Sequence, residues 1–336
     1  MEDMRSKKKS VKLISLALMI VFLLAAAFLL LKLWENSQGQ FQGPGPDEGG
    51  TVEYQGKEYV LRDNIETFLV LGLDKYKDAT GSDSHESGTV QADFLMLFVF
   101  DHDAKTTTAI QINRDTMANV NRLDIAGNKT GIVEQKQIAL AYNYAYQTEG
   151  RVNCRNTADS VSDLLLGVKV NHYLSLTMDS VVVINDLVGG VEVLVTDDFT
   201  GIDDTLIMGQ RVTLMGQRAL TYVRSRQGME DSTNSTRMQR QQQYMEALFD
   251  RAMHCIEADE EFLLKAADQV SPYIEYDSTE YRLKEFAERF DSYDFQGIRQ
   301  IEGQNKAGEE FMEFHPDEDS LWALVIQLFY TPKTGK

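Results

Sequence analysis

The sequence has little positive charge for its length. Its 336 residues carry 33 lysines and arginines against 52 aspartates and glutamates, which gives a net charge of −19. Nucleic-acid binding needs broad basic surfaces and many phosphate contacts, so this balance argues against it. No nucleic-acid-binding motif, internal repeat or strong interdomain linker is present either. With 43% hydrophobic and 25% charged residues, we expect most of the chain to be folded.

Cysteine is also scarce, with only Cys154 and Cys255. Both lie on predicted helices, in the part of the chain that we predict to be exported, where disulfides can persist. The sequence gives no distance between the two thiols. A disulfide bridge and two free buried thiols therefore remain equally open.

The N-terminus has the pattern of a membrane anchor. Residues 1–12 are rich in lysine and arginine, and Leu13 to Leu31 is an apolar run long enough for a bilayer core of about 30 Å. We predict a cytoplasmic tail over 1–12, a transmembrane anchor over 13–34, and a chain that is extracellular beyond it. A cleaved signal peptide is the competing interpretation, but no small-x-small cleavage site follows Leu31.

A polar segment rich in glycine and proline follows the anchor. We interpret residues 35–53 as a flexible linker, which keeps the folded part close to the outer leaflet. The main domain is predicted over 54–255. Residues 256–336 show no boundary of their own, so we expect them to pack on the same core.

The domain alternates between predicted strands and helices, which indicates an α/β layered sheet. The expected strands are Phe68–Leu73, Phe94–Phe100, Thr107–Ile112, Val170–Thr177 and Val191–Val195. The expected helices are Ile138–Tyr146, Ala158–Leu166 (capped by Asn156 or Thr157), Ser180–Val188, Tyr281–Phe290 (behind a capping box at Asp277 and Glu280) and Asp319–Phe329.

A cluster of arginines stands out in this acidic chain. Arg224 and Arg226 alternate around Ser225, and Arg237 and Arg240 lie three apart at the start of a predicted helix. Arginine forks bind phosphate oxygens in pairs, so the cluster favours an anion site. Surface salt bridges to the many carboxylates are the alternative.

Charged side chains also lie at the ends of predicted strands, where ligand sites of α/β sheets gather. Asp74 follows the first strand, Asp93 precedes the second, and Arg114 and Asp115 follow the third. Paired carboxylates with a diphosphate are a usual way to hold Mg²⁺. Turn and cap roles for Asp74 and Asp93 are the plainer interpretation.

Six motifs occur in an order that resembles the LytR-CpsA-Psr family of cell-envelope phosphotransferases of Gram-positive bacteria. They are GLD, DFLML, INRDTM, DLVGGVEV, RALTYVRSR and RMQRQQQ. The resemblance implies an α-β-α sandwich with a central mixed sheet behind one membrane helix. It also implies Mg²⁺-dependent transfer of an anionic glycopolymer, such as teichoic acid or capsule, from an undecaprenyl-diphosphate carrier to peptidoglycan through a phosphodiester.

The resemblance assigns roles to particular positions. It makes Asp74 and Asp93 the magnesium ligands, and Asp74, Asp93, Arg114 and Asp115 the catalytic residues. It makes Arg114, Arg224, Arg226 and Arg237 the diphosphate-binding residues, and it leaves Arg240 a structural role. It further implies an apolar tunnel for the prenyl chain, with candidate lining residues Val161, Leu164, Leu165, Val181, Val182, Ile184 and Leu187.

The chain departs from the family pattern at some positions. Gln91 stands where many members have an arginine, and Asn234 replaces a frequent acidic residue, with Asp231 an approximate substitute. Fewer arginine forks therefore reach the diphosphate. A non-catalytic envelope regulator or carrier-binding protein, and a diphosphate hydrolase, are the two alternative functions.

Overall fold

The structure is a computed structural model that describes residues 50–77, 83–85, 90–144, 150–225, 234–259, 262–276, 293–309 and 311–333. The predicted tail and anchor (1–34) and the predicted helix Tyr281–Phe290 with its capping box lie outside these residues. Within the described part of the chain, no helix has the length and apolar character to cross a membrane. The strand β1 (Thr51–Tyr54) pairs with β2 (Lys57–Leu61), so the fold begins inside the segment that we interpreted as linker.

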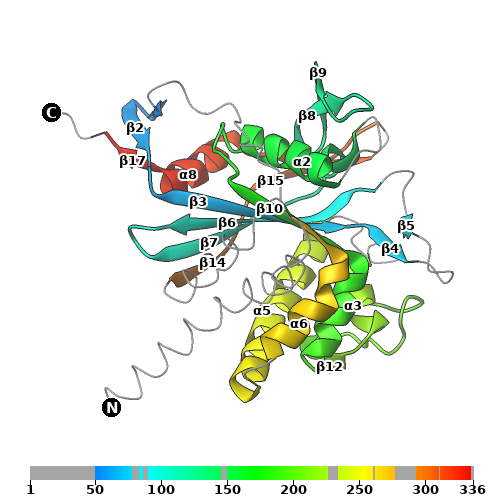
Figure 1. The fold of residues 1–336 in the computed structure, drawn as a ribbon. Helices are drawn as coiled ribbons and strands as arrows, with labels where there is room; N and C mark the ends of the chain where they lie inside the picture. The colour runs from blue at the N-terminus through cyan, green and yellow to red at the C-terminus, as the bar shows by residue number, and fades with distance from the viewer. Residues whose placement is uncertain are drawn as a thin grey trace, which may run out of the picture.

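A six-stranded mixed sheet forms the centre of the fold (Figure 1). Its strands, in spatial order, are β13 (Ile274–Tyr276), β10 (His172–Thr177), β3 (Ile65–Leu73), β6 (Ala92–Asp101), β7 (Thr106–Ile112) and β14 (Asp294–Gln300). The pairs β10–β3 and β7–β14 are parallel, and the other three pairs are antiparallel. The strands β3 and β6 are long apolar runs because both of their faces are covered, and β7 is buried as well although it carries threonines and Gln111.

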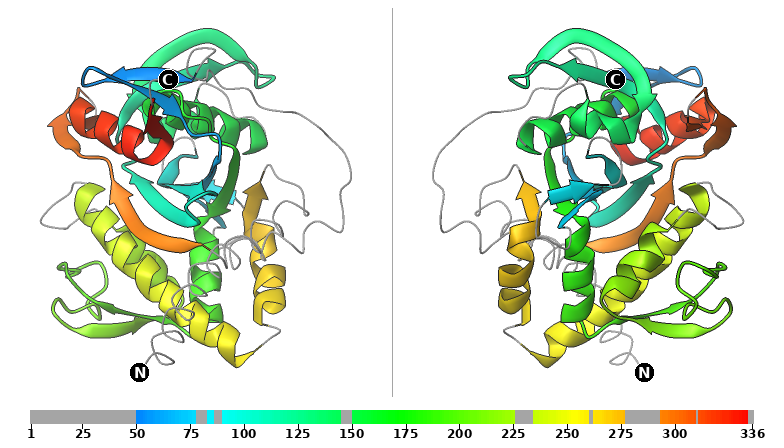
Figure 2. Two further views of the ribbon diagram at one scale, coloured as in Figure 1. Left: turned by 90° about the vertical axis from the view of Figure 1, so that its left-hand side faces the viewer. Right: turned by 90° about the vertical axis from the view of Figure 1, so that its right-hand side faces the viewer.

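Helices cover both faces of the sheet (Figure 1, Figure 2). One face carries the 3₁₀ helix η2 (Ile138–Asn143), α2 (Gly150–Leu164) and α8 (Glu318–Phe329). The other carries α3 (Met178–Leu187), α4 (Gln217–Arg224), α5 (Asn234–Ala258) and α6 (Phe262–Val270), which the 3₁₀ helix η3 (Ser271–Tyr273) follows. The side chains alternate along β3, so Phe68 and Val70 face the second layer while Leu69 and Leu71 face the first. The fold is therefore a mixed α/β sandwich, as expected.

Smaller strand pairs lie around the sheet. They are β4 (Lys75–Lys77) with β5 (Asp83–His85), β8 (Met117–Leu123) with β9 (Lys129–Gln137), β11 (Val191–Leu194) with β12 (Arg211–Leu214), β15 (Gly303–Ala307) with β16 (Met312–Pro316), and β17 (Tyr330–Pro332) with β2. Strand β14 pairs with β7 in the central sheet, and β17 pairs with β2. Helix α8 packs in the same core layer as α2.

Three expectations about elements need correction. The segment expected as a helix from Ile138 forms only a short 3₁₀ helix. Helix α2 begins at Gly150, so Asn156 lies inside it, where its side chain donates to the carbonyls of Asn121 and Ala141 rather than capping a terminus. The strand at Val191 belongs to a separate hairpin and not to the central sheet.

The two cysteines are free thiols on opposite sides of the sheet. Cys154 lies on α2 and is buried in the core on that face of the sheet. Cys255 lies on α5 and is partly buried against the core on the other face. Burial raises the pKa of the Cys255 thiol, which keeps it in its neutral form.

Candidate functional site

The candidate site begins where β3 and β6 meet at one end of the sheet. Asp74 directly follows β3 and is buried, and its Oδ1 accepts a hydrogen bond of 2.6 Å from the main-chain N–H of Gln91. The main-chain N–H of Asp74 donates in turn to the carbonyl of Gln91 at 3.0 Å. Asp74 thus fixes the entry into β6, one residue pair beyond the last paired positions of the two strands.

Asp93 lies in a β-bulge. Gly72 pairs with Phe94 but Leu73 pairs with Ala92, so Asp93 is the extra residue on β6. A bulge turns side chains away from strict alternation and is frequent beside functional sites. A Cβ added at Gly72 would approach the Cβ of Phe94 to 2.9 Å, so this close strand pairing depends on glycine.

Two arginines from distant elements converge on Asp93. Arg237 of α5 donates from Nη1 to Oδ2 at 3.1 Å and from Nη2 to the Asp93 carbonyl at 3.3 Å. Arg114, at the end of β7, donates from Nη1 to Oδ1, and its Nη2 donates to the side-chain oxygen of Gln91. Both arginine side chains are less than a tenth exposed. The structure therefore brings together Asp93 and Arg114 from the strand-end pattern and Arg237 from the arginine cluster.

Asp115 lies behind Arg114 rather than beside Asp93. Its Oδ1 is 3.4 Å from Nε of Arg114 and accepts a hydrogen bond of 3.1 Å from the side-chain amide of Gln137. Its own N–H donates to the side chain of Asn113, which closes the turn after β7. Asp115 is thus placed to orient Arg114.

Arg224 is the last residue of α4 and lines a pocket together with Asp93 and Arg237. The helix end is held by Arg240, which is 1% exposed. Arg240 donates to the carbonyls of Tyr222 and Ser225, forms an ion pair with Asp197, and does not line the pocket. A cation that satisfies the last carbonyls stabilises a helix terminus, and these contacts are consistent with the structural role expected for Arg240. Arg226 lies outside the described residues.

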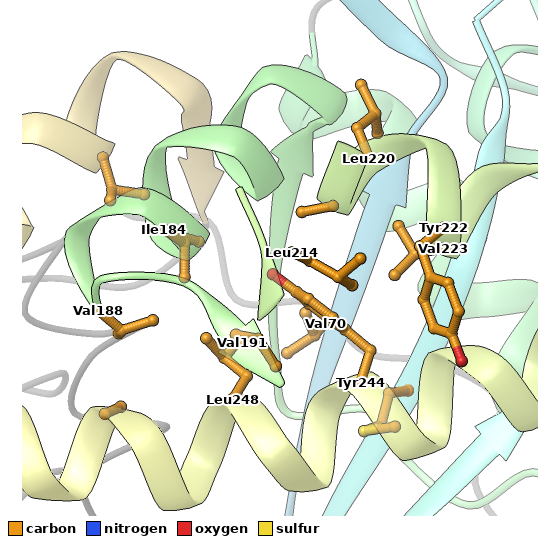
Figure 3. Packing of buried hydrophobic residues seen from close by; sticks show 14 of the residues in the cluster. Val70, Ile184, Val188, Val191, Leu214, Leu220, Tyr222, Val223, Tyr244 and Leu248 are labelled. Carbon is orange, nitrogen blue, oxygen red and sulfur yellow. The ribbon is translucent and has the colours of Figure 1, made fainter. Parts of the chain in front are cut away.

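The pocket is apolar beyond this charged mouth. The empty space between β3, β6, α3, α4 and α5 measures about 1010 Å³, a figure that includes open solvent at the mouth. Figure 3 shows Ile184 of α3 directed toward α5, from which Tyr244 and Leu248 point back. Burial raises the pKa of Tyr244, so its hydroxyl stays protonated and donates to Asn185 at 3.2 Å. The arrangement can hold a long apolar chain whose head group is a multivalent anion.

The expected tunnel residues divide between the two layers. Val181 and Ile184 line the pocket. Val161, Leu164 and Leu165 lie in the opposite layer, so their assignment to the tunnel is wrong. The reason is that α2 has an apolar face of the same kind as α3, and composition does not say which face of the sheet a helix covers.

Gln241 is a pocket residue that our sequence reasoning missed. It follows Arg237 by four residues and therefore lies on the same face of α5. Its amide donates to the Val223 carbonyl at 3.2 Å and accepts from Gln111 at 3.4 Å. The i, i+4 spacing in RMQRQQQ could have identified it, whereas no local signal indicates Gln111.

The carboxylates that could hold a metal at this end of the sheet are those of Asp74 and Asp93. Among the described residues, no group of three or more His, Cys, Asp or Glu side chains is arranged as a metal site. Mg²⁺ needs fewer, since it commonly binds one or two carboxylates and completes its shell with substrate phosphates and water. Hard oxygen donors beside arginines fit that mode of binding. In this structure the Asp93 oxygens accept from arginines.

Fold and site together define an α/β protein with an apolar pocket and a mouth of arginines and aspartates. The chain belongs to the LytR_cpsA_psr family, whose model matches residues 46–325. It is 28% identical over 281 residues to the polyisoprenyl-teichoic acid–peptidoglycan teichoic acid transferase TagU of Enterococcus faecalis, covering 81% of this chain and 82% of that protein. It is 26% identical over 250 residues to the TagU of Bacillus licheniformis, covering 74% and 72%.

Solved structures share the fold. The structure of TagT bound to LI-WTA superimposes with a TM-score of 0.56 at 17% identity, covering 79% of this chain and 90% of that one. Protein gbs0355 of Streptococcus agalactiae gives a TM-score of 0.61 at 17% identity, covering 79% and 86%. At such identities the likeness supports the fold alone.

Proposed function

We propose that this protein transfers an anionic glycopolymer from an undecaprenyl-diphosphate carrier to peptidoglycan. The observation that carries the proposal is the pocket, in which an apolar interior formed by α3 and α5 opens beside Asp93, Arg224 and Arg237. An amphiphile with a long apolar chain and a diphosphate head matches both parts. The family relatives named as teichoic acid transferases support the same reaction class.

In the proposed reaction, a hydroxyl oxygen of peptidoglycan forms a new bond to the phosphorus that carries the polymer. The bond from that phosphorus to the bridging oxygen breaks, prenyl phosphate leaves with the electron pair of that bond, and the hydroxyl proton is lost to solvent. The polymer is then joined through a phosphodiester. Negative charge gathers on the leaving phosphate. We assign stabilisation of this charge to Arg224 and Arg237, which line the pocket, and to Arg114, which bonds to Asp93 beside it, and we expect Arg226 to assist them.

We further propose that Asp74 and Asp93 hold Mg²⁺ on the diphosphate. Bound Mg²⁺ would neutralise part of the diphosphate charge. Asp93 accepts from Arg114 and Arg237 in the absence of substrate, and both arginines can transfer these hydrogen bonds to phosphate oxygens. The Asp93 carboxylate is then available as a metal ligand, while Asp115 continues to orient Arg114.

The anchor over 13–34 is proposed to keep the domain outside the cell, beside the membrane that holds the carrier. Protease added to intact protoplasts should then digest residues after Gly50. Full protection of these residues would exclude the proposed localisation.

The function is tested with full-length protein, a defined lipid-linked donor and peptidoglycan oligomers, with and without Mg²⁺. We expect a phosphodiester-linked product by mass spectrometry only when acceptor and Mg²⁺ are both present. Release of polymer to water regardless of acceptor would identify a hydrolase. Tight donor binding with no product under any condition would identify a carrier-binding protein.

A further inference from the structure

Gln137, the last residue of β9, contacts Asp115, which in turn contacts Arg114. Gln137 has no role in the function proposed above. It is 9% exposed, and its side-chain nitrogen lies 3.1 Å from Oδ1 of Asp115 and 2.7 Å from the carbonyl oxygen of Met312. Both partners are acceptors only. The amide must therefore present its NH₂ group to them, with one hydrogen for each oxygen.

The contact continues from Asp115 to the site. The same Oδ1 that accepts from Gln137 is 3.4 Å from Nε of Arg114, while the Nη atoms of Arg114 donate to Asp93 and Gln91. Nε and the Nη atoms belong to one rigid plane, so fixing Nε fixes the direction of the fork. The contact is an ion pair and not a hydrogen bond, so Asp115 attracts the Nε side of the Arg114 plane and thereby biases where its Nη atoms point.

The other end of the contact is the C-terminal strand β16. The N–H of Phe314 donates to the carbonyl of Asp115 at 2.8 Å, and Thr116 forms a bridge with Phe314. The N–H of Ile138 donates to the carbonyl of Thr116, also at 2.8 Å. The turn after β7 is therefore clamped between β16 and the segment that follows Gln137.

We propose that Gln137 is a positioning residue for Arg114, and that β16 is the fixed support from which it acts. The proposal rests on the proposed function for its kinetic consequence, but its structural consequence is independent of activity. A neutral amide is suited to the task, because it donates to the buried Asp115 carboxylate without competing as a cation with Arg114. The role assigned to the C-terminal part is thus to orient the arginine of the INRDTM loop.

The test replaces Gln137 by methionine, which is of similar length but has no N–H donor. The matched control is Gln135→Met on the same strand, where the glutamine is exposed and bonds only to Asn119. We expect Gln137→Met to lower kcat for polymer transfer about 10- to 100-fold with KM within about threefold, since misplacement by about 1 Å costs that much. The control should keep native values. Equal kcat in the two variants would overturn the proposal.

A measurement that does not depend on activity keeps the test decisive. Hydrogen exchange of the Arg114 Nε–H, assigned in ¹⁵N spectra by its loss in Arg114→Lys, should be at least tenfold faster in Gln137→Met than in the control. Unchanged exchange would overturn the proposal even if the native protein transfers no polymer, an outcome that would contradict only the proposed function.

The second variant, Gln137→Glu, covers the case in which Gln137→Met does not fold. Its new carboxyl can donate to Asp115 only while protonated, so its activity and its Arg114 Nε–H protection should be greatest at low pH and fall as pH rises. A pH profile parallel to that of the native protein would contradict the proposed positioning role.

Discussion

Asp93 and Arg237 form an ion pair of 3.1 Å at the mouth of the pocket, although 144 residues separate them in the chain. Asp93 is thus the acidic partner of the Arg237 guanidinium group, which in the proposed function binds the diphosphate. Because Asp93 also accepts from Arg114, its carboxylate holds both guanidinium groups at the pocket mouth.

The first prediction concerns Arg224, the helix-end residue at the pocket mouth. Arg224→Lys keeps the charge but loses the planar fork, so a prenyl diphosphate should bind about 10- to 100-fold more weakly, equivalent to about 1.5–3 kcal/mol. Isothermal titration calorimetry measures this change. Arg211→Lys is the control, because Arg211 is exposed and pairs only with the exposed Glu192. Native affinity in Arg224→Lys would place the anion site elsewhere.

The sequence predicted the strand-end residues well because a local rule governs them. Asp74, Arg114 and Asp115 end apolar runs that could only be buried strands, and the ends of neighbouring strands meet. The bulge at Asp93 could not be predicted, since it arises from the pairing of Gly72 with Phe94 and Leu73 with Ala92. Bulges depend on the partner strand and not on one local pattern.

The supporting contacts are less predictable still. Gln137 meets Met312 across 175 residues, and β16 carries no motif that announces its place beside Asp115. The sequence also does not predict which face of the sheet α2 covers, because the apolar faces of α2 and α3 are alike in composition. Long-range pairing decides these features, and local propensity contains no information about it.

The second prediction concerns the depth of the pocket. Ala252 on α5 lines it, whereas Ala266 on α6 is buried in the same core but away from it. Replacing either by leucine overpacks the core and should cost about 1–3 kcal/mol of unfolding free energy. Only Ala252→Leu should lower the affinity for the longest prenyl diphosphates, by about 0.8 kcal/mol for each CH₂ excluded. An identical chain-length dependence in both variants would exclude this pocket as the prenyl site.

The third prediction concerns pH and a cluster away from the site. Burial raises the pKa of Glu66, but the hydrogen bonds and charges of His172 and then His102 outweigh it, so the pKa lies below its ordinary 4.5. The Glu66 oxygens are 3.2 Å and 3.0 Å from the Nε2 atoms of His172 and His102, and Nδ1 of His102 is 2.6 Å from the hydroxyl of Tyr293. The cluster links β3 and β10 to the residue after β6 and the residue before β14.

A carboxyl whose pKa is lower in the folded than in the unfolded protein stabilises the fold fully at pH values above its unfolded-state pKa. This stabilisation is lost as the pH falls through the folded-state pKa. Glu66→Gln should therefore reduce the free energy of unfolding by about 1.5 kcal/mol at pH 7, and by progressively less below about pH 4.5. Urea unfolding across this range measures the difference. The exposed Glu53→Gln is the control and should show no such dependence. A constant difference between pH 7 and pH 3 would contradict the assignment.

The last prediction separates an enzyme from a binding protein. If Asp74 and Asp93 hold Mg²⁺ on the diphosphate, Asp74→Asn and Asp93→Asn should abolish Mg²⁺-dependent transfer while most prenyl affinity remains, because burial of the chain does not require the metal. In calorimetry, Mg²⁺ should raise the affinity of the native protein for the prenyl diphosphate. It should leave the affinity of both variants unchanged. Asp93→Asn should also weaken the hold on Arg237, so its metal-free affinity for diphosphate should differ from that of Asp74→Asn. Transfer that survives both substitutions would refute the metal ligands, and a native protein that binds the donor with Mg²⁺ but never transfers it would favour the binding function.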